Sequence, residues 1–373
     1  MMRPLEGIRV LDFSTLLPGP MATLVLAEAG AEVLKIERPD RGDEMRSYVP
    51  KFGDDSVNFA LLNRGKRSIV IDLKQPDSLE RLRPLIESAD IVIEQFRPGV
   101  MDRLGLGYDA LTAINDKIIY CAITGYGQSG HCANVAAHDL NYVAQVGMLG
   151  LSAGADGSPV VPPALIADIA GGTYPTIINI LLALRQRDRT GKGCKLDIAM
   201  ADNLFTFLYW AIGNGQVAGQ WPAPGGELVT GGSPRYQIYR TRDDKFIAAA
   251  PLEDKFWANF MDAIGAPNEL LDDSQPPQLV KARIQQILGS QSANYWEARF
   301  DGKDVCCSVV ASMEEAMANR HFEARGIFSH TLASGDARIT ALPVPIVPQF
   351  RGDDSGSGYP ALGEANAEFG LGK

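Results

Sequence analysis

The sequence predicts an α/β fold, in which a large domain built on a parallel sheet is accompanied by a smaller α+β domain. Three observations predict this class. Strand-like and helix-like segments alternate through the first third of the chain, the strand-like runs are apolar throughout, and the composition changes after Gly213. Continuous apolar strands separated by helices are typical of a parallel sheet that is covered on both faces.

Five apolar runs predict the strands of this sheet. They are Ile8–Phe13, Ala31–Glu37, Ser68–Leu73, Ile91–Phe96 and Lys117–Thr124. The segment Met21–Ala29 is predicted to be a helix that ends at Gly30, because glycine is favoured just after a helix C-terminus. A second helix is predicted from Pro76 to Ser88, with a kink or an early end at Pro84.

The second half of the chain predicts a long apolar helix and then a separate smaller domain. The helix is expected at about Gly172–Arg187. The region Gln216–Ser233 is rich in Gly and Pro and is predicted to be a linker or a substrate-facing loop. Further strands and helices are expected at Tyr236–Tyr239, Lys245–Ala250, Lys255–Ile264 and Leu279–Leu288. We therefore place the smaller domain at residues 215–310.

The composition is that of an ordinary globular protein of 373 residues, with 46% apolar and 21% charged residues. A net charge of −10 argues against a nucleic-acid or anionic-membrane partner. The five cysteines are odd in number and form no CxxC pair, so neither a disulfide framework nor a metal site is expected, and a cytoplasmic location is the simplest. The most apolar stretch, Thr173–Leu184, is too short to span a bilayer and is predicted to be a core helix.

Motifs for nucleotide cofactors are missing from the sequence. No GxGxxG string follows the first strand, and no GxxxxGK[ST] string occurs anywhere. The first motif would place a pyrophosphate at a helix N-terminus and the second would cradle a triphosphate. We therefore expect neither NAD, FAD nor a nucleoside triphosphate as a cofactor.

Two residues in the middle of the chain are candidates for proton transfer. His138 follows a turn-rich segment, and histidine is the usual general base at neutral pH, although a His before an Asp is more often a surface or capping residue. Asp168 precedes the apolar helix, where it is either a plain N-cap or a carboxylate whose pKa is changed by apolar surroundings. These residues alone do not decide between the two interpretations.

Other chemistry-bearing residues have a weaker sequence context. Glu253 follows an apolar strand, where an acidic side chain is usually solvated. Cys306 and Cys307 have no histidine beside them in the sequence, so a catalytic cysteine is not favoured. Basic residues fall near strand ends of the first domain, where several together would make an anion site, because ligands bind at the carboxyl ends of parallel strands.

Several strings in chain order carry a resemblance to a known family. They are PLEGIRVLD at 4–12, LPGP at 17–20, AGAEV at 29–33, KIERP at 35–39, NRGKR at 63–67, IDLK at 71–74, FRPGV at 96–100, RLG at 103–105, TGYGQ at 124–128, TGKG at 190–193 and HFEARG at 321–326. Together they resemble the class III CoA-transferase superfamily (the CaiB/BaiF type) over almost the whole chain.

The resemblance implies a Rossmann-like large domain formed by residues 1–214 and 311–373, a small domain at 215–310, and an interlocked homodimer. The active site would lie between the large domain of one subunit and the small domain of the other. Coenzyme A would enter as part of an acyl-CoA substrate, with no metal or redox cofactor. The implied CoA-contacting positions are Arg38, Asp72, Leu73, Lys74, Phe96, Arg97, Arg103, Ala137, Asp139 and Tyr142.

Within the family, the sequence most resembles the α-methylacyl-CoA racemase branch. His138 and Asp168 match its two acid–base residues, and Glu253 matches an acidic residue that supports the histidine. The resemblance implies epimerisation of the α-carbon of an acyl-CoA by 1,1-proton transfer through an enolate. Backbone N–H groups near a helix start at Gly171-Gly172 would face the thioester oxygen.

Two alternatives stay open. In a class III CoA-transferase, Asp168 would form a mixed anhydride with the acyl group, although residues 225–232 do not match the tetraglycine loop of that branch. A CoA-binding protein without catalysis is the other alternative. Ala137 replaces the usual Gly, residues 40–55 are longer than the racemase pattern, and His131 replaces the usual Pro, so His131 competes for the catalytic role. The sequence does not determine the acyl group or the pathway.

Overall fold

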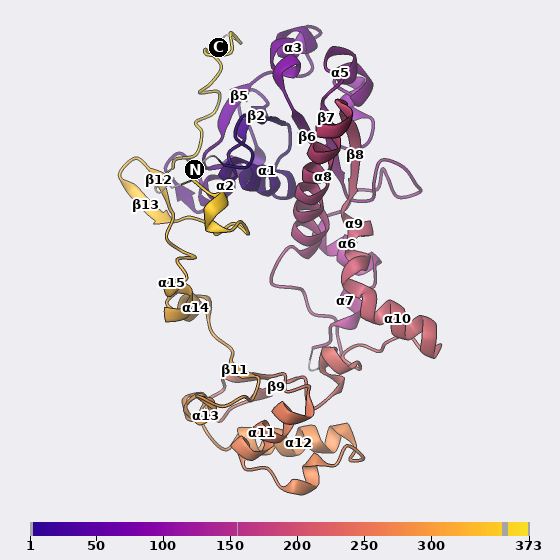
Figure 1. Ribbon diagram of the computed structural model, residues 1–373, viewed down its shortest axis with the longest axis vertical. Coiled ribbons are helices and arrows are strands. Elements are labelled where there is room, and N and C mark those ends of the chain that lie inside the picture. The colour runs from indigo at the N-terminus through magenta and orange to yellow at the C-terminus, as the bar shows by residue number, and fades with distance from the viewer. Residues whose placement is uncertain (1–2, 155, 353–356, 372–373) are drawn as a thin grey trace. The chain divides into compact units, whose positions relative to one another are not determined.

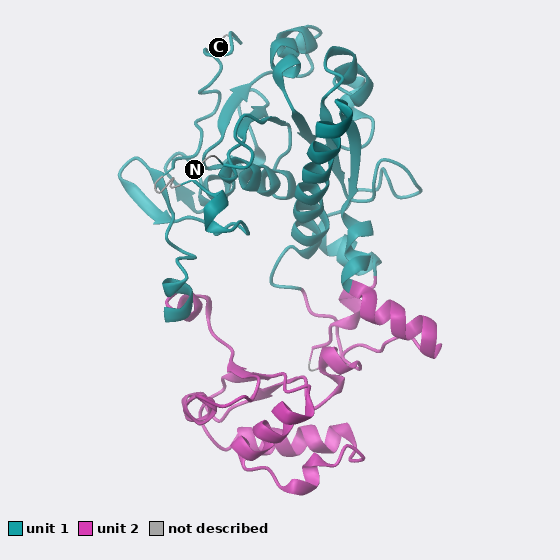
Figure 2. Ribbon diagram, viewed as in Figure 1, with its two compact units in different colours: residues 1–146, 162–207, 320–373 teal, residues 147–161, 208–319 magenta. Residues whose placement is uncertain are grey.

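The computed structural model describes residues 3–154, 156–352 and 357–371. The chain divides into two compact units (Figure 2). Unit 1 comprises residues 1–146, 162–207 and 320–373, and unit 2 comprises residues 147–161 and 208–319. The domain limits expected at residues 214 and 310 stay predictions, because compactness alone does not show which segments fold independently.

A six-stranded parallel sheet forms the centre of unit 1 and confirms the predicted α/β class. Its strand order is β5-β2-β1-β6-β7-β8, and every neighbouring pair is parallel (Figure 1). The strands are β1 (Arg9–Asp12), β2 (Glu32–Glu37), β5 (Arg67–Val70), β6 (Ile91–Glu94), β7 (Ile119–Thr124) and β8 (Cys194–Ala199). Five of them overlap the predicted runs. Edge strand β8 was not predicted, because its first half alternates between exposed and half-buried residues.

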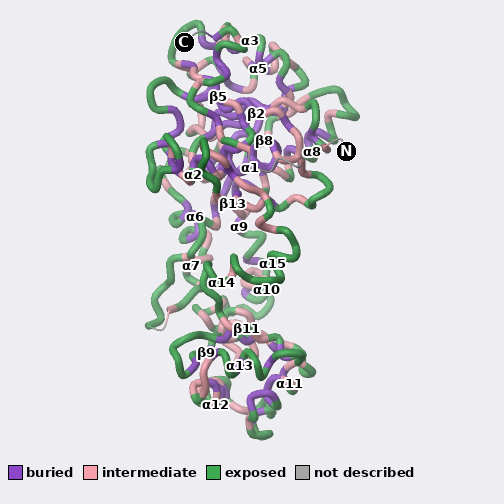
Figure 3. The backbone as a smooth tube through the Cα atoms, turned by 90° about the vertical axis from the view of Figure 1, so that its left-hand side faces the viewer, coloured by how far each residue is buried: buried purple, intermediate pink, exposed green. Residues whose placement is uncertain are grey.

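Helices cover both faces of this sheet. Helices α3 (Ser78–Ser88) and α5 (Tyr108–Ile114) share one apolar core with Leu11, Leu34 and Val92. Helix α8 (Tyr174–Thr190) packs on β7 and β8 and also contacts α1 (Pro18–Glu28). Buried residues gather on the strands between these helices (Figure 3). The apolar character of the strands therefore correctly predicted a sheet with helices on both faces.

One helix start differs from the sequence prediction because of a proline, and an expected early end at another proline does not occur. Helix α1 begins at Pro18, three residues before the predicted start, since a proline in the first turn lacks only an N–H that would be unpaired there anyway. Helix α3 continues through Pro84 to Ser88, so the helix does not end there.

A continuous helical segment runs from Ala167 to Thr190 through η2 (Ala167–Thr173) and α8. By length and composition this whole segment passes the test for a membrane span, because it extends beyond the apolar stretch Thr173–Leu184 at both ends. The same test is passed by core helices, and 44% of the apolar window of this one is buried. Its packing against β7 and β8 favours a core helix.

The remaining elements of unit 1 lie around the sheet. They are η1 (Glu44–Ser47), β3 (Lys51–Phe52), β4 (Asp55–Ser56), α2 (Val57–Asn63), α4 (Val100–Arg103), α6 (Asp139–Gln145), α9 (Met200–Leu204), α15 (Arg320–Ala324), β12 (Thr331–Ser334), β13 (Ala337–Thr340) and η6 (Pro348–Phe350). The short helix η3 (Phe205–Leu208) spans the limit between the two units.

Unit 2 is built on a three-stranded antiparallel sheet of order β11-β10-β9, with strands β9 (Gln237–Arg240), β10 (Phe246–Ala249) and β11 (Cys307–Val309). Its helices are α7 (Met148–Leu151), α10 (Tyr209–Ala218), η4 (Leu228–Gly232), α11 (Asp254–Ile264), η5 (Asn268–Leu271), α12 (Pro277–Leu288), α13 (Ala293–Phe300) and α14 (Met313–Met317). Trp257, Phe260 and Ile284 lie in its apolar core. Unit 2 therefore has a core of its own.

Candidate active site

A cavity of about 410 Å³ opens at the carboxyl ends of the parallel strands in unit 1. The strand order reverses between β1 and β6, and ligands of such sheets bind at this switch point. The cavity is lined by residues that follow β1, β6 and β7, by the loop before α6, and by residues of η2 and α9. They are Leu16, Pro18, Gln95, Phe96, Arg97, Pro98, Ile123, Thr124, Gly125, Tyr126, Ala133, Val135, Ala136, Ala137, His138, Asn141, Tyr142, Asp168 and Met200.

His138 lies at the N-cap position of α6 and lines this cavity. Its backbone N–H donates to Oδ1 of Asn141 at 3.0 Å, and its carbonyl accepts the N–H of Asn141 at 2.8 Å. Both bonds involve the His138 backbone and fix the start of the helix, and the residue is exposed. The structure thus brings the predicted histidine to the cavity by a capping position, and the two sequence interpretations of His138 are compatible.

Asp168 lies inside the helical segment η2, and it is not the N-cap that one interpretation of the sequence proposed. Its backbone N–H donates to Oδ1 of Asp139 at 2.9 Å. Burial, and to a smaller extent the neighbouring Asp139 carboxylate, raise the pKa of the Asp168 carboxyl to about 7. A carboxyl with this pKa can give up or take a proton near neutral pH, which is the property that acid–base chemistry requires.

The expected helix start at Gly171-Gly172 is wrong. These residues lie in the middle of the continuous helix Ala167–Thr190, so their N–H groups are not the free donors of a helix N-terminus. Their small size has another reason: a Cβ atom on Gly171 would lie 2.3 Å from the carbonyl oxygen of Met200, and one on Gly172 would lie 3.0 Å from Cβ of Pro18. The glycines therefore let η2 pack closely against its neighbours.

The aromatic wall of the cavity is formed by Tyr126 and Tyr142, whose rings meet edge to face at 5.1 Å between centroids. The Tyr142 hydroxyl donates to the carbonyl of Ala137 at 2.9 Å and so holds the residue before His138. Burial raises the pKa of Tyr142 to about 12, with a contribution from Asp168. A Cβ atom on Gly125 would lie 2.4 Å from the Tyr142 ring, so glycine is required there.

Two hydroxyl groups of the cavity-lining residues were missed by the sequence reasoning. Among the described residues, Thr124 Oγ1 and the Tyr126 hydroxyl are buried and have no hydrogen-bond partner. Buried polar groups normally have one, so these two are candidates to bind a ligand. The TGYGQ string that follows β7 was the only signal that could have found them.

The predicted CoA-contacting residues do not all line this cavity. Phe96, Arg97, Ala137 and Tyr142 do, and the Asp139 carboxylate accepts a hydrogen bond from the backbone N–H of Asp168. Arg38 lines a second cavity of about 640 Å³, together with Arg41, Arg46 and Lys51. Asp72, Leu73, Lys74 and Arg103 line neither cavity; Leu73 packs on the apolar core, and the Asp72 carboxylate accepts the Lys74 N–H at 3.0 Å.

The remaining candidates lie outside the cavity lining. Glu253 is exposed at the N-cap position of α11 in unit 2, so its expected support of His138 stays a prediction. His131 is exposed and does not line the cavity, although the loop that follows it does. Cys307 donates to the Val305 carbonyl in unit 2, and burial raises its pKa to about 12, which makes it a poor nucleophile.

Comparisons with known proteins identify the family of this chain. Residues 5–366 match the profile of CoA-transferase family III. The chain is 34% identical to the human alpha-methylacyl-CoA racemase, with 98% of this chain and 92% of that protein covered. It is 35% identical to the acetyl-CoA:oxalate CoA-transferase of Acetobacter aceti, with 92% and 89% covered. A CAIB/BAIF family protein from Brucella suis has a similar solved structure, with a TM-score of 0.81, 27% identity, and 99% and 98% covered.

Proposed function

The chain belongs to CoA-transferase family III, and on this premise we propose that it is an α-methylacyl-CoA racemase-like enzyme that epimerises the α-carbon of an acyl-CoA thioester. One observation carries the proposal: His138 and Asp168 line the same cavity at the switch point of the sheet. Epimerisation needs a proton carrier on each face of one carbon. His138, at the start of α6, and Asp168, in η2, are two such carriers.

The proposed reaction is a 1,1-proton transfer. One of the two residues removes the α-proton, the electron pair moves onto the thioester oxygen as an enolate, and the other residue returns a proton to the opposite face. A pKa of about 7 suits Asp168 to both steps. The unpartnered hydroxyl groups of Thr124 and Tyr126 are donors that suit the enolate oxygen.

Coenzyme A would be held as part of the substrate, with no further cofactor. Arg97 lines the cavity beside the proton carriers, and Arg38 lines the cavity that also contains Arg41 and Lys51. Guanidinium groups match phosphate geometry, so these cationic positions can bind the diphosphate and 3′-phosphate of CoA despite the net charge of −10. Asp72, Lys74 and Arg103 line neither cavity, so we propose them only as contacts to the part of CoA that lies outside the cavities.

We propose a cytoplasmic homodimer. Helix α8 exposes large apolar side chains, with Ile178 56% and Leu182 62% exposed, which is typical of a surface that a second subunit covers. In such a dimer the partner subunit's Glu253 would support His138. Light scattering on the purified protein tests the dimer, and Leu182→Glu should convert it to a monomer.

A class III CoA-transferase is the second candidate function, since relatives of about equal identity have that activity in their names. In that reaction the Asp168 carboxylate attacks the thioester carbonyl, the C–S bond breaks, and CoA leaves as a thiolate from the mixed anhydride. The thiolate then attacks the Asp168 carbonyl of the anhydride and releases the donor acid, which leaves CoA on Asp168 as a thioester. An acceptor carboxylate repeats these two steps in reverse order and leaves as the new CoA thioester, and the Asp168 carboxylate is restored. A CoA-binding protein without catalysis would bind CoA and do neither reaction.

One experiment separates the three functions. The enzyme is incubated with a panel of acyl-CoA thioesters in D₂O, with and without acceptor carboxylic acids, and the thioesters are analysed by mass spectrometry. A mass increase at the α-carbon without an acceptor supports the racemase. If new thioesters form only with an acceptor, and hydroxylamine traps an acyl adduct of Asp168, the protein is a CoA-transferase and the racemase proposal is wrong. Binding without either product would leave only the non-catalytic function.

A further inference from the structure

The turn between β1 and α1 forms one wall of the cavity. Leu16 and Pro18 both line it. Leu16 also packs in the same apolar cluster as Ile169, the residue that follows Asp168. The Pro18 carbonyl accepts a hydrogen bond from the Thr173 hydroxyl at 2.9 Å, and both residues are buried. The position of this turn therefore determines where η2, the segment that carries Asp168, can lie.

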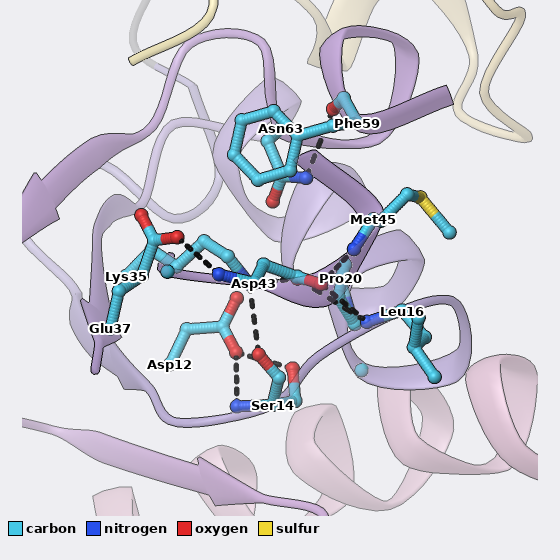
Figure 4. Close-up of polar contacts among 12 residues, drawn as sticks. Asp12, Ser14, Leu16, Pro20, Lys35, Glu37, Asp43, Met45, Phe59 and Asn63 are labelled. Carbon is cyan, nitrogen blue, oxygen red and sulfur yellow. Dashed lines mark hydrogen bonds and ion pairs between the residues drawn. The ribbon is translucent and has the colours of Figure 1, made fainter. Parts of the chain in front are cut away.

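The backbone of this turn is strained at Leu16. Its φ angle of +62° lies in the left-handed region, which is unfavourable for residues other than glycine. Such a conformation persists only when surrounding contacts hold it. The Leu16 N–H donates to both carboxylate oxygens of Asp43, at 3.2 Å each, as Figure 4 shows.

Asp43 is itself held from several sides and is 1% exposed. The Lys35 ammonium lies 2.9 Å from Oδ2 of Asp43 and also donates to the Ser14 carbonyl at 2.8 Å (Figure 4). The buried Lys35 cation thus contacts the turn directly at Ser14 and, through Asp43, at Leu16. Burial opposes the charge of Lys35, but Asp43 and the nearby acidic groups outweigh it and raise the pKa of Lys35.

We propose that Asp43 and Lys35 are positioning residues for the reaction: they hold the Leu16 backbone in its left-handed conformation and so keep the cavity wall packed against the segment of Asp168. Neither residue lines the cavity, so they act through the turn. The effect on catalysis rests on the proposed function, whereas the effect on the turn does not.

The first test is Asp43→Asn. The amide cannot pair with Lys35 as a carboxylate does, so the turn should open more often. Hydrogen exchange of a peptide covering residues 13–18, read by mass spectrometry, should become about tenfold faster or more. The kcat of α-proton exchange should fall by about ten- to a hundredfold with little change in KM, because the displaced wall affects the reacting carbon and not the CoA anchors.

A matched pair of second-site variants separates positioning from general damage. Leu16→Ala and Leu16→Gly both remove the side chain from the cavity wall, but only glycine adopts positive φ without cost. In the Asp43→Asn background, Leu16→Gly should restore slow exchange at 13–18 and part of kcat, and Leu16→Ala should not. Equal behaviour of the two double variants would overturn the proposal. If Asp43→Asn does not fold, the two Leu16 variants are compared in the wild-type background, where Leu16→Gly should resist denaturant better.

Glu28→Gln is the control for lost buried ion pairs. Glu28 pairs with Arg64 and Arg351 at the far end of α1 and has no recorded contact with residues 13–17. It should lower stability without faster exchange at 13–18 and without a lower kcat. Unchanged exchange at 13–18 in Asp43→Asn would contradict the proposal. A wild-type enzyme that leaves every α-proton in place would refute the racemase function, while the exchange measurement would still decide the role of Asp43 in the turn.

Discussion

Two regions of unit 1, a buried charge cluster and the partly open cavity, contain aspartates in opposite environments. In the charge cluster of Figure 4, Asp12 contacts Lys66 and accepts a bond from Thr23 at 2.6 Å, and Lys66 and Lys35 help to lower its pKa against the effect of burial. In the cavity, burial raises the pKa of Asp168 to about 7, and its carboxylate has neither ion pair nor hydrogen bond among the residues described.

The comparison shows that the partner, and not burial, decides what a buried carboxylate does. A cation fixes the charge and gives the carboxylate a structural role, as it does for Asp43 beside Lys35. A carboxylate without a cation exchanges protons near neutral pH and is available for chemistry. The two regions meet at the turn of residues 13–17, so changes in either one test the comparison.

The largest expected effect is on catalysis, in the cavity. His138→Ala and Asp168→Ala should each lower α-proton exchange in D₂O by about 10²–10⁴-fold, because each removes one of the two proton carriers. Circular dichroism should show that both variants stay folded, since neither side chain has an ion pair to lose. His131→Ala is the matched control and should keep wild-type activity; loss of exchange in that variant would move the catalytic role to His131.

The next largest effect is on the stability of the charge cluster. Lys35→Met leaves the buried Asp43 carboxylate without its cation, and it should lower the free energy of unfolding by about 3–5 kcal/mol. Urea denaturation measures this change. Arg83→Met is the control, because Arg83 and Glu80 form an exposed pair whose loss should change stability much less. Equal losses in the two variants would show that the cluster is not structurally special.

A smaller effect is expected at the cation of the cavity. Arg97→Gln should raise the KM or Kd for acyl-CoA by about ten- to a hundredfold, which corresponds to one lost charge-assisted hydrogen bond of roughly 1.5–3 kcal/mol, with kcat changed much less. Titration of CoA by calorimetry at two salt concentrations provides the measurement. If affinity stays the same and depends equally on salt, Arg97 does not bind the phosphates.

The smallest effect is a change in the pH dependence of stability. The pKa of Asp168 is about 7 in the folded state and near 3.8 in the unfolded state, so the folded protein binds the extra proton between these values. Its contribution to stability is complete below about pH 4 and is lost as the pH rises through 7. In the wild-type protein this titration should lower the free energy of unfolding by about 1–2 kcal/mol between pH 5 and 8, after a discount for solvent screening. In Asp168→Asn this decrease should be absent.

Urea denaturation of both proteins at several pH values checks this expectation. Glu94, whose pKa burial also raises to about 7, contributes a slope of the same sign and remains in the variant, so the variant keeps part of the dependence. Two parallel stability curves would show that Asp168 titrates in its ordinary range and would weaken its acid–base role.

The strands of the sheet and most helices were predictable because burial on two faces leaves a local record in the sequence. Apolar runs gave β1, β2, β5, β6 and β7, whereas the edge strand β8 has one open side and a mixed composition that hid it. The helix start at Gly171-Gly172 was misjudged because glycines there serve close packing against Met200 and Pro18, which are distant in sequence.

By itself the sequence determined the α/β class, the family, and two residues, His138 and Asp168, as candidates for proton transfer. Only the tertiary structure decided that both line one cavity, that the Asp168 carboxyl lacks a cation, and that Asp43 and Lys35 hold the turn beside it. Periodicity and caps depend on neighbours along the chain. A shifted pKa and a strained turn depend on groups tens of residues away, and only folding brings those together.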